Sequence, residues 1–485
     1  MKYLQINGQN WDEIDEIRLD DYLAERPVAN YLLVDCQDIE VIDLKRLIDS
    51  VRSRYILYRG ATKEQKQLLD EFGHFDISKI WEFKKLAQEL DFMLDDLVQT
   101  QGFSATPDEA ARLSDNFQGR IERHGRYEML IEGDFPEETV VFDLQRLVKN
   151  WSRNVYVIPF RRFYNAPGRH KLIFDYQTKG DIKVTYLIFT LDHQGNLLKT
   201  DRITEKEYLF EAAVNVDFQG QVLIQGKGTA TLGKVWTYKD KQGLGWFQAG
   251  DRRDITSEGE AVHSLYLPGK KKEKLIVGFS GNLSELPHYE RQSMANYGFP
   301  VLLFCDLRAR GGAFHIGKKT YEETLTALID EKLTELGLHH QDLILIGWSM
   351  GSFPAMYYGL KMQVGEVIAA KPLLHLGQVT DKVEVAFRSE PSMIEARHYL
   401  TGNYRAEDTA KLDAIIEEAL ASSDPSQTNF HVFMMKNDEL DHCEQLFENL
   451  KAHAKSVSIR KEAGFHSEKI PQMSRWIDEV LESFD

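Results

Sequence analysis

The nine residues Leu343–Gly351, with the sequence LILIGWSMG, decide the fold of the region around them. The run LILI predicts a strand buried on both faces, and the residues from Phe353 to Met362 predict a helix after it. The G-x-S-x-G pattern between them permits a sharp strand-to-helix turn, which lifts the Ser349 hydroxyl clear of the sheet. The context therefore predicts a nucleophilic serine, with a structural Gly-Ser turn as the alternative.

Strands and helices alternate on both sides of this motif. A helix is predicted at Tyr321–Leu336, and residues 381–424 form a largely helical insertion that suits a lid or cap. Five further buried strands are predicted at Leu275–Phe279, Val301–Cys305, Val367–Ala370, His431–Met435 and Val457–Arg460. Such alternation indicates a parallel sheet covered by helices. We therefore predict an α/β-hydrolase fold for residues 271–485.

A nucleophilic serine needs a histidine to accept its proton and a carboxylate to orient that histidine. In this fold the acid follows a late strand and the histidine follows the last one. His466 lies after the last predicted strand and before the final helix, so it is the predicted base. Asp438 and Glu439 lie nearest the end of the preceding strand, while Asp441 suits a helix cap. The residues themselves leave Asp438 and Glu439 open as the acid.

Two backbone N–H groups are expected to stabilise the oxyanion. One belongs to Met350, directly after the serine, and the other to Phe279 or Ser280 in the loop after the first strand, where an ordinary glycine turn is the alternative. The glycine-rich segment Asp306–Phe314 should border the same cleft. The alternative for its acid and arginines is a structural one, in which they pair with each other and hold the loop.

The sequence of residues 1–270 predicts two further domains. In residues 1–150, the strands Tyr31–Cys36 and Arg54–Tyr58 are each followed by an amphipathic helical stretch, and Ile80–Leu113 is mostly helical, which predicts a Rossmann-like α/β scaffold. In residues 151–270 the apolar residues recur at every second position, and this pattern predicts an antiparallel β-sandwich. The many aromatic residues there suit its core, with stacking on sugar rings as the alternative.

Composition narrows the classes of function. The 485 residues carry a formal net charge of −17, which argues against binding nucleic acid or anionic lipid. Three scattered cysteines, no signal-peptide pattern after Met1 and no apolar run of membrane-span length predict a cytoplasmic protein. There is no H-E-x-x-H, Cys/His cluster or phosphate loop, so we expect no metal and no cofactor.

The chain resembles a known family: the acyltransferase-like component, the second of the Asp proteins, of the accessory Sec system of Gram-positive bacteria. The resemblance extends over nearly the whole three-part layout. Its most specific motifs are Gly347–Gly351 with Phe353 and Tyr357–Gly359, Asp306–Phe314 (DLRARGGAF) and Lys436–Asp441 (KNDELD). It implies a serine triad with a glutamate as its acid, which favours Glu439 over Asp438.

The resemblance also implies a function. Members of this family act in the export of serine-rich repeat glycoprotein adhesins, and the resemblance implies O-acetylation of N-acetylglucosamine on the adhesin. The implied partners are the two other Asp components, the accessory SecA motor and the glycosylated adhesin, with peripheral docking on the inner face of the membrane through the translocon. A carbohydrate or general esterase with the same triad, and a structural subunit of the export complex, are the alternatives.

Overall fold

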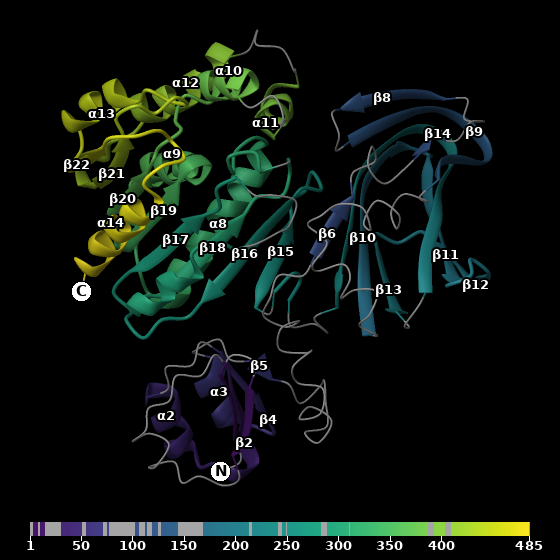
Figure 1. The fold of residues 1–485 in the computed structure, drawn as a ribbon, viewed down its shortest axis with the longest axis horizontal. Helices are drawn as coiled ribbons and strands as arrows, with labels where there is room; N and C mark the ends of the chain where they lie inside the picture. Colours follow the sequence, from purple (N-terminus) through teal and green to yellow (C-terminus); the bar gives the residue numbers. More distant parts are fainter. Residues whose placement is uncertain are drawn as a thin grey trace.

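The computed structural model contains three hydrogen-bonded sheets within its described residues (Figure 1). The described residues are 3–7, 10–14, 31–50, 55–70, 75–76, 102–105, 112–113, 119–124, 128–143, 168–212, 216–240, 245–248, 250–282, 289–309, 311–386, 392–402 and 409–484. Together they form a mixed α/β protein with several sheets, as the sequence predicts. No helix among them combines the length and the apolar character needed to cross a membrane.

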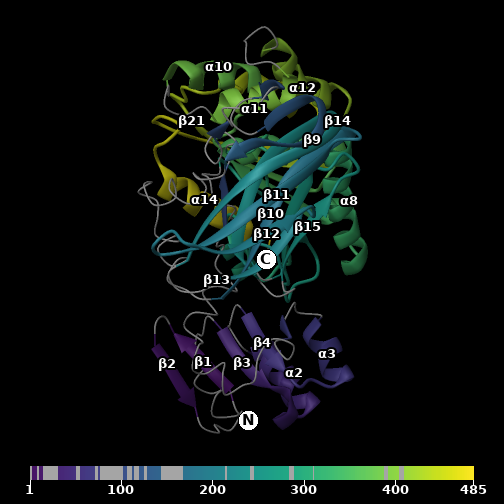
Figure 2. The same cartoon turned by 90° about the vertical axis from the view of Figure 1, so that its right-hand side faces the viewer.

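The first sheet is small and mixed, and it lies apart from the other two in both views (Figures 1 and 2). Its strands lie in the order β2-β1-β3-β4-β5, with β3, β4 and β5 parallel. The strands are β1 (Tyr3–Asn7), β2 (Asn10–Ile14), β3 (Tyr31–Asp35), β4 (Tyr55–Arg59) and β5 (Phe75–Asp76), and the helices are η1 (Cys36–Asp38), α2 (Val41–Ser50) and α3 (Lys63–Asp70). The strands and helices predicted around Tyr31–Cys36 and Arg54–Tyr58 are present.

The second sheet is antiparallel, and the 24-residue strand β14 pairs with β6, β9, β10 and β11. Its strands are β6 (Gly102–Ala105), β7 (Arg112–Leu113), β8 (Arg120–His124), β9 (Glu128–Asp143), β10 (Gly168–Gly180), β11 (Lys183–Asp192), β12 (Leu197–Ile203), β13 (Glu207–Ala212) and β14 (Val216–Lys239). The predicted antiparallel strands are present, but the described residues form one continuous hydrogen-bonded sheet instead of two separate ones. Inward side chains such as Phe174 and Tyr186, whose rings stack at 4.0 Å, fill its core.

Strand pairing differs from the predicted boundaries at both ends of this sheet. The strands β6 and β9, predicted in the first domain, pair with β14, where Ile131, for example, lies opposite Ala230. The strands β7 and β8 pair with β9. Within the stretch 80–113, predicted to be helical, the described residues are strands and the rest lie outside the described part. At the other end, β15 (Asp251–Ile255) and β16 (Ala261–Leu267) belong to the third sheet. Local periodicity predicts a strand, whereas its hydrogen-bonding partner depends on distant residues.

The third sheet has the order β15-β16-β18-β17-β19-β20-β21-β22, and all pairs from β18 to β22 are parallel. Its further strands are β17 (Leu275–Phe279), β18 (Val301–Cys305), β19 (Leu343–Trp348), β20 (Glu366–Ala370), β21 (Asn429–Met435) and β22 (Ser456–Glu462). The helices of this region are η2 (Gln292–Tyr297), α8 (Lys319–Leu336), η3 (His340–Asp342), η4 (Ser349–Gly351), α9 (Ser352–Met362), α10 (Leu376–Ala386), α11 (Ser392–Thr401), α12 (Thr409–Ala421), η6 (Pro425–Gln427), α13 (Glu444–Lys451) and α14 (Ile470–Glu482).

Both faces of the third sheet are covered, as the unbroken apolar run in β19 predicts. Leu343 and Leu345 pack on one face with α8, α9 and α13, and Ile344 and Ile346 pack on the other face with α14. Each of these side chains is buried, which stabilises the fold by about 1.5–3 kcal/mol apiece. The rigid strand β19 therefore holds the residues at its carboxyl end in a fixed place.

The helical insertion lies at one end of the third sheet, where α10, α11 and α12 gather (Figure 1). The Asp413 carboxylate on α12 accepts the N–H of Gly377 at 2.8 Å and that of Gln378 at 3.2 Å. Because these N–H groups belong to the first turn of α10, this contact fastens the two helices together.

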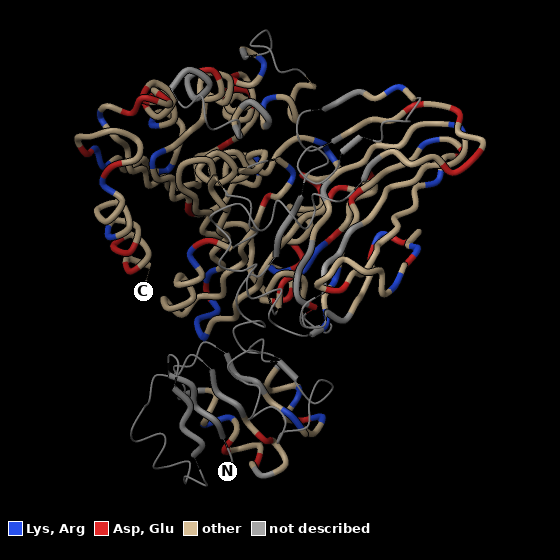
Figure 3. The backbone as a smooth tube through the Cα atoms, turned by 45° about the vertical axis from the view of Figure 1, so that its right-hand side comes forward, with Lys and Arg blue, Asp and Glu red and all other residues tan. Residues whose placement is uncertain are grey.

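Acidic and basic residues are interspersed throughout the described part of the chain (Figure 3).

Candidate active site

The strand β19 ends in a sharp turn that carries Ser349. Ser349 has φ 51°, in the left-handed region that residues other than glycine rarely adopt. A Cβ atom on Gly347 would lie 1.9 Å from the Gly351 carbonyl oxygen, and one on Gly351 would lie 2.5 Å from that of Phe279. Only glycine fits at these two positions. The turn therefore has the geometry that the G-x-S-x-G pattern predicts, with α9 starting directly after it.

His466 lies within hydrogen-bonding distance of Ser349, although 117 residues separate them in the sequence. Its Nε2 atom is 3.0 Å from the Ser349 hydroxyl oxygen. His466 belongs to the loop between β22 and α14, and parallel strand pairing from β19 through β22 brings that loop to the end of β19. Because proton transfer needs heavy atoms about 2.6–3.2 Å apart, the imidazole is placed to accept the serine proton.

Asp438 lies on the opposite side of the His466 ring. Its Oδ2 atom is 2.8 Å from His466 Nδ1, and its Oδ1 atom accepts the N–H of Leu440 at 3.0 Å. Asp438 is buried, so few water molecules compete for the carboxylate. A carboxylate in this position favours the Nδ1–H tautomer, which leaves Nε2 free to accept a proton from Ser349.

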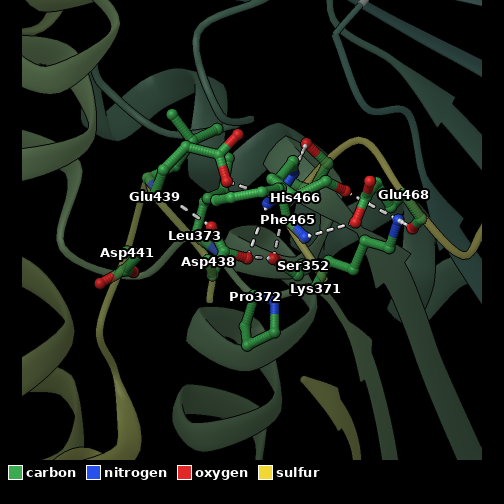
Figure 4. A network of polar contacts seen from close by, with 12 residues as sticks. Ser352, Lys371, Pro372, Leu373, Asp438, Glu439, Asp441, Phe465, His466 and Glu468 are labelled. Atoms are coloured by element: carbon green, nitrogen blue, oxygen red, sulfur yellow. Dashed lines mark hydrogen bonds and ion pairs between the residues drawn. The ribbon is translucent and has the colours of Figure 1, made fainter. Parts of the chain in front are cut away.

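Glu439, which the family resemblance favours as the acid, does not contact the His466 ring. Its Oε2 atom accepts the backbone N–H of His466 at 2.9 Å (Figure 4). The preference for Glu439 over Asp438 therefore does not fit this geometry. Adjacent side chains point in different directions, so the shorter Asp438 side chain meets the ring and the longer Glu439 side chain meets the loop backbone.

Asp441, the third carboxylate of this loop, has another partner. Its Oδ1 atom is 2.8 Å from Nδ1 of His375, and its Oδ2 atom accepts the N–H of His375 at 3.0 Å. The hydrogen bond to Asp441 raises the pKa of His375. Asp441 thus holds the chain that leads into α10, and it does not act as a cap of α13.

The backbone N–H groups predicted to stabilise the oxyanion differ in their hydrogen bonds within the folded chain. Met350 lies directly after Ser349 and is buried at the start of the turn. The N–H of Ser280, in contrast, donates to the Phe304 carbonyl oxygen at 3.1 Å, so the structure does not support Ser280 as a donor. The next N–H, that of Gly281, donates to Glu290 Oε2 at 2.8 Å. Met350 remains the predicted donor, whereas Phe279 is the last residue of β17, a strand that pairs with β18 on one side and β19 on the other.

The glycine-rich segment after β18 is held by a buried ion pair. Asp306 accepts two hydrogen bonds from the Arg308 side chain, at 2.9 and 2.8 Å, and the N–H groups of Ala313 and His315 at 2.9 Å each. Burial acts to raise the pKa of Asp306, but the charge and hydrogen bonds of Arg308 hold it well below its usual range. The acid and one arginine thus pair with each other, which is the structural alternative expected from the sequence.

This ion pair also organises the buried residues behind the site. His315 Nε2 lies 3.2 Å from the hydroxyl oxygen of Ser280, and burial lowers the pKa of His315 to about 4. The imidazole is therefore neutral at physiological pH. No motif in the sequence predicts this contact between Ser280 and His315.

Comparison with known proteins places the chain in a family. A family model described as accessory Sec system GspB-transporter matches residues 6–482, and the chain belongs to this family. It is 27% identical over 379 residues to an accessory Sec system protein, the second of the Asp proteins, of Staphylococcus aureus (strain NCTC 8325 / PS 47), covering 74% of this chain and 69% of the relative. It is 25% identical over 336 residues to the protein of the same name from Streptococcus gordonii, covering 68% and 63%.

A solved structure shares the fold of this accessory Sec family member. It comes from the Glycosylation Associate Protein (Gap123) complex of Streptococcus agalactiae, with a TM-score of 0.76 and 21% identity, and the match covers 96% of this chain and 90% of that one. The resemblance to the accessory Sec family is thereby confirmed at the level of the family and of the fold. The family membership gives this protein a role in the accessory Sec system.

One residue of the site in this accessory Sec protein has no signal in the sequence. Lys371 follows β20, and its ammonium donates a hydrogen bond to the His466 carbonyl oxygen at 2.7 Å. A single lysine between a strand and a proline looks like a surface residue, and only the folded chain brings it to the His466 loop. Among the described residues, no group of three or more His, Cys, Asp or Glu side chains is arranged to hold a metal ion.

Proposed function

We propose that this protein is a serine-dependent O-acetyltransferase that modifies N-acetylglucosamine on serine-rich repeat glycoprotein adhesins and supports their export through the accessory Sec system. The observation that carries the proposal is the line of contacts from Ser349 to Asp438. The serine hydroxyl lies 3.0 Å from His466 Nε2, and Asp438 lies 2.8 Å from Nδ1 of the same ring. A hydroxyl, an imidazole and a carboxylate in this order activate a serine for acyl transfer.

In the first half of the reaction the enzyme takes up the acetyl group. The Ser349 oxygen attacks the carbonyl carbon of an activated acetyl ester or thioester while His466 Nε2 accepts the serine proton. Asp438 stabilises the imidazolium that forms. The bond from carbon to the leaving group then breaks, and the proton on His466 passes to that group. The Met350 N–H and the start of α9 stabilise the negative charge on the oxygen.

In the second half the acetyl group moves to the acceptor. A sugar hydroxyl transfers its proton to His466 Nε2 as its oxygen attacks the acetyl carbonyl carbon. The bond to Ser349 breaks and the serine oxygen recovers the proton. The product is the O-acetylated sugar and free enzyme, so atoms and charges balance without a cofactor.

The surroundings of the reacting groups suit a sugar acceptor. Phe465, next to His466, is 55% exposed, and Trp348, next to Ser349, lies under the Arg291 guanidinium at 4.2 Å. The exposed Phe465 ring beside His466 offers a flat apolar face, which matches the C–H face of a pyranose, whereas the Arg291 guanidinium covers one face of Trp348. We propose that the same site faces the cytoplasm at the inner side of the membrane.

The partners follow from the family. The two other Asp components, the accessory SecA motor and the glycosylated adhesin are the proposed partners, and the fold shared with a chain of the Gap123 complex supports assembly with other subunits. Two alternatives remain distinct functions. With water as the acceptor the same triad makes a carbohydrate or general esterase, and without reaction the chain is a structural subunit of the export complex.

Fluorophosphonate labelling tests the central claim, because the probe reacts with activated serines. We expect labelling of the unaltered protein, none of Ser349→Ala, and normal labelling of Ser467→Ala, a matched change at an exposed serine beside His466. If the wild-type protein is folded but is not labelled, the remaining alternative is a structural subunit of the export complex.

A second assay separates transferase from esterase. The protein is incubated with an acetyl ester, with and without an N-acetylglucosamine-modified adhesin fragment, and both free acetate and acetylated sugar are quantified by mass spectrometry. Acetylated sugar formed only when Ser349 is present supports the transferase. Release of free acetate alone favours the esterase.

A further inference from the structure

Lys371 lies beside the turn that carries Ser349. The parallel pairing of β19 with β20 sets Ala370 opposite Trp348, so the residue after each strand, Lys371 and Ser349, begins the neighbouring loop. Lys371 has φ 49°, and its N–H donates to the Phe433 carbonyl oxygen of β21 at 2.6 Å. A non-glycine residue in this conformation costs about 1 kcal/mol, so surrounding contacts must hold it.

The side chain of Lys371 is buried and points at the loop that carries His466 (Figure 4). The residue is only 3% exposed. Its ammonium donates to the carbonyl oxygens of His466, at 2.7 Å, and of Glu468. Burial lowers the pKa of Lys371, and the nearby carboxylates of Asp438, Glu439 and Glu468 act in the opposite direction. A buried ammonium is unfavourable unless such partners surround it.

His466 is held at three separate points. Its ring is bound by Asp438, its N–H by Glu439 and its carbonyl oxygen by Lys371. The two carboxylates belong to the loop after β21, whereas Lys371 belongs to the chain directly after β20, the strand paired with that of Ser349. Of these three contacts, therefore, the one from Lys371 ties His466 to the serine side of the site.

We propose that Lys371 is a positioning residue for acyl transfer, whose ammonium fastens the His466 loop to the strand beside Ser349 and so sets the distance between the serine oxygen and His466 Nε2. This inference rests on the proposed function, because it requires that Ser349 and His466 react. The present separation of 3.0 Å is near the upper end of the range for proton transfer. A displacement of about 1 Å is enough to slow such a step about 100-fold.

The chemistry of the two acceptors explains why a lysine stands here. An ammonium directs three N–H bonds to different places and so reaches two carbonyl oxygens on one loop. Arginine keeps the charge but carries its donors in a planar fork, which fits this pair less well. Methionine has a similar stem but no donor, so it removes both hydrogen bonds while filling most of the space.

The experiment compares Lys371→Met, Lys371→Arg and Lys361→Met. Lys361 is a matched control because it is an exposed lysine in the last turn of α9, where it pairs with Glu322 away from Ser349. Folding of each variant is first checked by circular dichroism and thermal melting. The rate of fluorophosphonate labelling, kcat and KM for an acetyl ester are then measured well below the melting temperature.

We expect Lys371→Met to lower kcat and the labelling rate about 10- to 100-fold with KM changed less than about twofold. Lys371→Arg should recover part of the loss, and Lys361→Met should match the wild type. A merely structural lysine would lower the melting temperature without this loss of kcat in the folded protein. If Lys371→Met fails to fold, the proposal still requires a several-fold lower kcat in folded Lys371→Arg.

Two results overturn the proposal in distinguishable ways. Folded Lys371→Met that is labelled at the wild-type rate refutes the role of Lys371 and leaves the proposed function standing. The same holds for folded Lys371→Arg at the wild-type kcat when Lys371→Met is unfolded. Wild-type protein that is folded but never labelled refutes the proposed function itself, and the role of Lys371 falls with it.

Discussion

The Nδ1 atom of His466 lies 2.8 Å from Oδ2 of Asp438. Under the proposed function, this contact makes Asp438 the carboxylate that orients the imidazole. The neighbouring Glu439 binds the backbone of the same histidine instead. The two carboxylates therefore support one residue in different ways, and mutations should separate them.

Replacing Asp438 with Asn should lower kcat about 10³- to 10⁴-fold, because the amide no longer stabilises the imidazolium or the correct tautomer. Glu439→Gln keeps an acceptor oxygen for the His466 N–H and should lower kcat about tenfold or less. Steady-state kinetics with an acetyl ester provides the measurement. A larger loss in Glu439→Gln than in Asp438→Asn would contradict the assignment of Asp438.

Replacing Phe465 with Ala should weaken binding of the sugar acceptor, since the exposed ring beside His466 provides an apolar face. We expect KM for the acceptor to rise about 3- to 10-fold, as the loss of about 0.5–1.5 kcal/mol implies. The rate of acetyl ester hydrolysis without acceptor should stay within about twofold. Ile470→Ala, at an equally exposed apolar residue that begins α14, is the control and should leave both values unchanged.

Adding a methyl group at Gly347 should destabilise the protein strongly. The new Cβ atom would lie 1.9 Å from a backbone oxygen that cannot move without breaking the turn, so we expect Gly347→Ala to lose about 3 kcal/mol or more. Gly337→Ala is the matched control. Gly337 also has a positive φ, of 69°, but open space around its Cβ position, and should lose about 1 kcal/mol. Urea denaturation compares the two, and similar losses would argue against the crowded turn.

Replacing Arg308 with Met should leave the buried Asp306 carboxylate without its cation and cost about 3–5 kcal/mol at neutral pH. Arg308 holds the pKa of Asp306 below its unfolded value near 4, so in the wild type this pair contributes stability above about pH 4 and loses it as the pH falls. In the variant, burial still raises the pKa of Asp306 while the charge of Arg308 no longer lowers it, so we expect the folded state to take up a proton as the pH falls.

The stability difference between Arg308→Met and the wild type should therefore shrink between pH 7 and about pH 4. Urea denaturation at several pH values measures it. Lys451→Met is the control, because the exposed pair of Lys451 with Glu448 contributes at most about 1 kcal/mol. A deficit that stays constant with pH would show that Arg308 acts through packing alone.

Periodicity and motif spacing predicted much of the third sheet. The strands from β17 to β22 and the helices α8 and α9 lie within a few residues of their predicted ranges. Ser349 was predicted from the G-x-S-x-G motif and His466 from its place after the last strand, and the structure sets them 3.0 Å apart. These features are local: buried strands are apolar throughout, and a sharp turn demands glycine at Gly347 and Gly351.

Other features depended on contacts between distant residues. Only hydrogen bonds to β14 assign β9 to the second sheet, and only pairing with β18 assigns β16 to the third sheet. A continuous sheet and a two-sheet sandwich both show period two, so periodicity does not distinguish them.

By itself, then, the sequence determined the parallel α/β region, the glycine turn and the identities of the serine and the histidine, because each leaves a pattern within a short stretch of chain. The tertiary structure decided that Asp438 and not Glu439 contacts the His466 ring, engaged the N–H of Ser280 with Phe304, and brought Lys371 to the His466 loop. Adjacent carboxylates have almost the same chemistry, and only the folded backbone sets which one meets the imidazole.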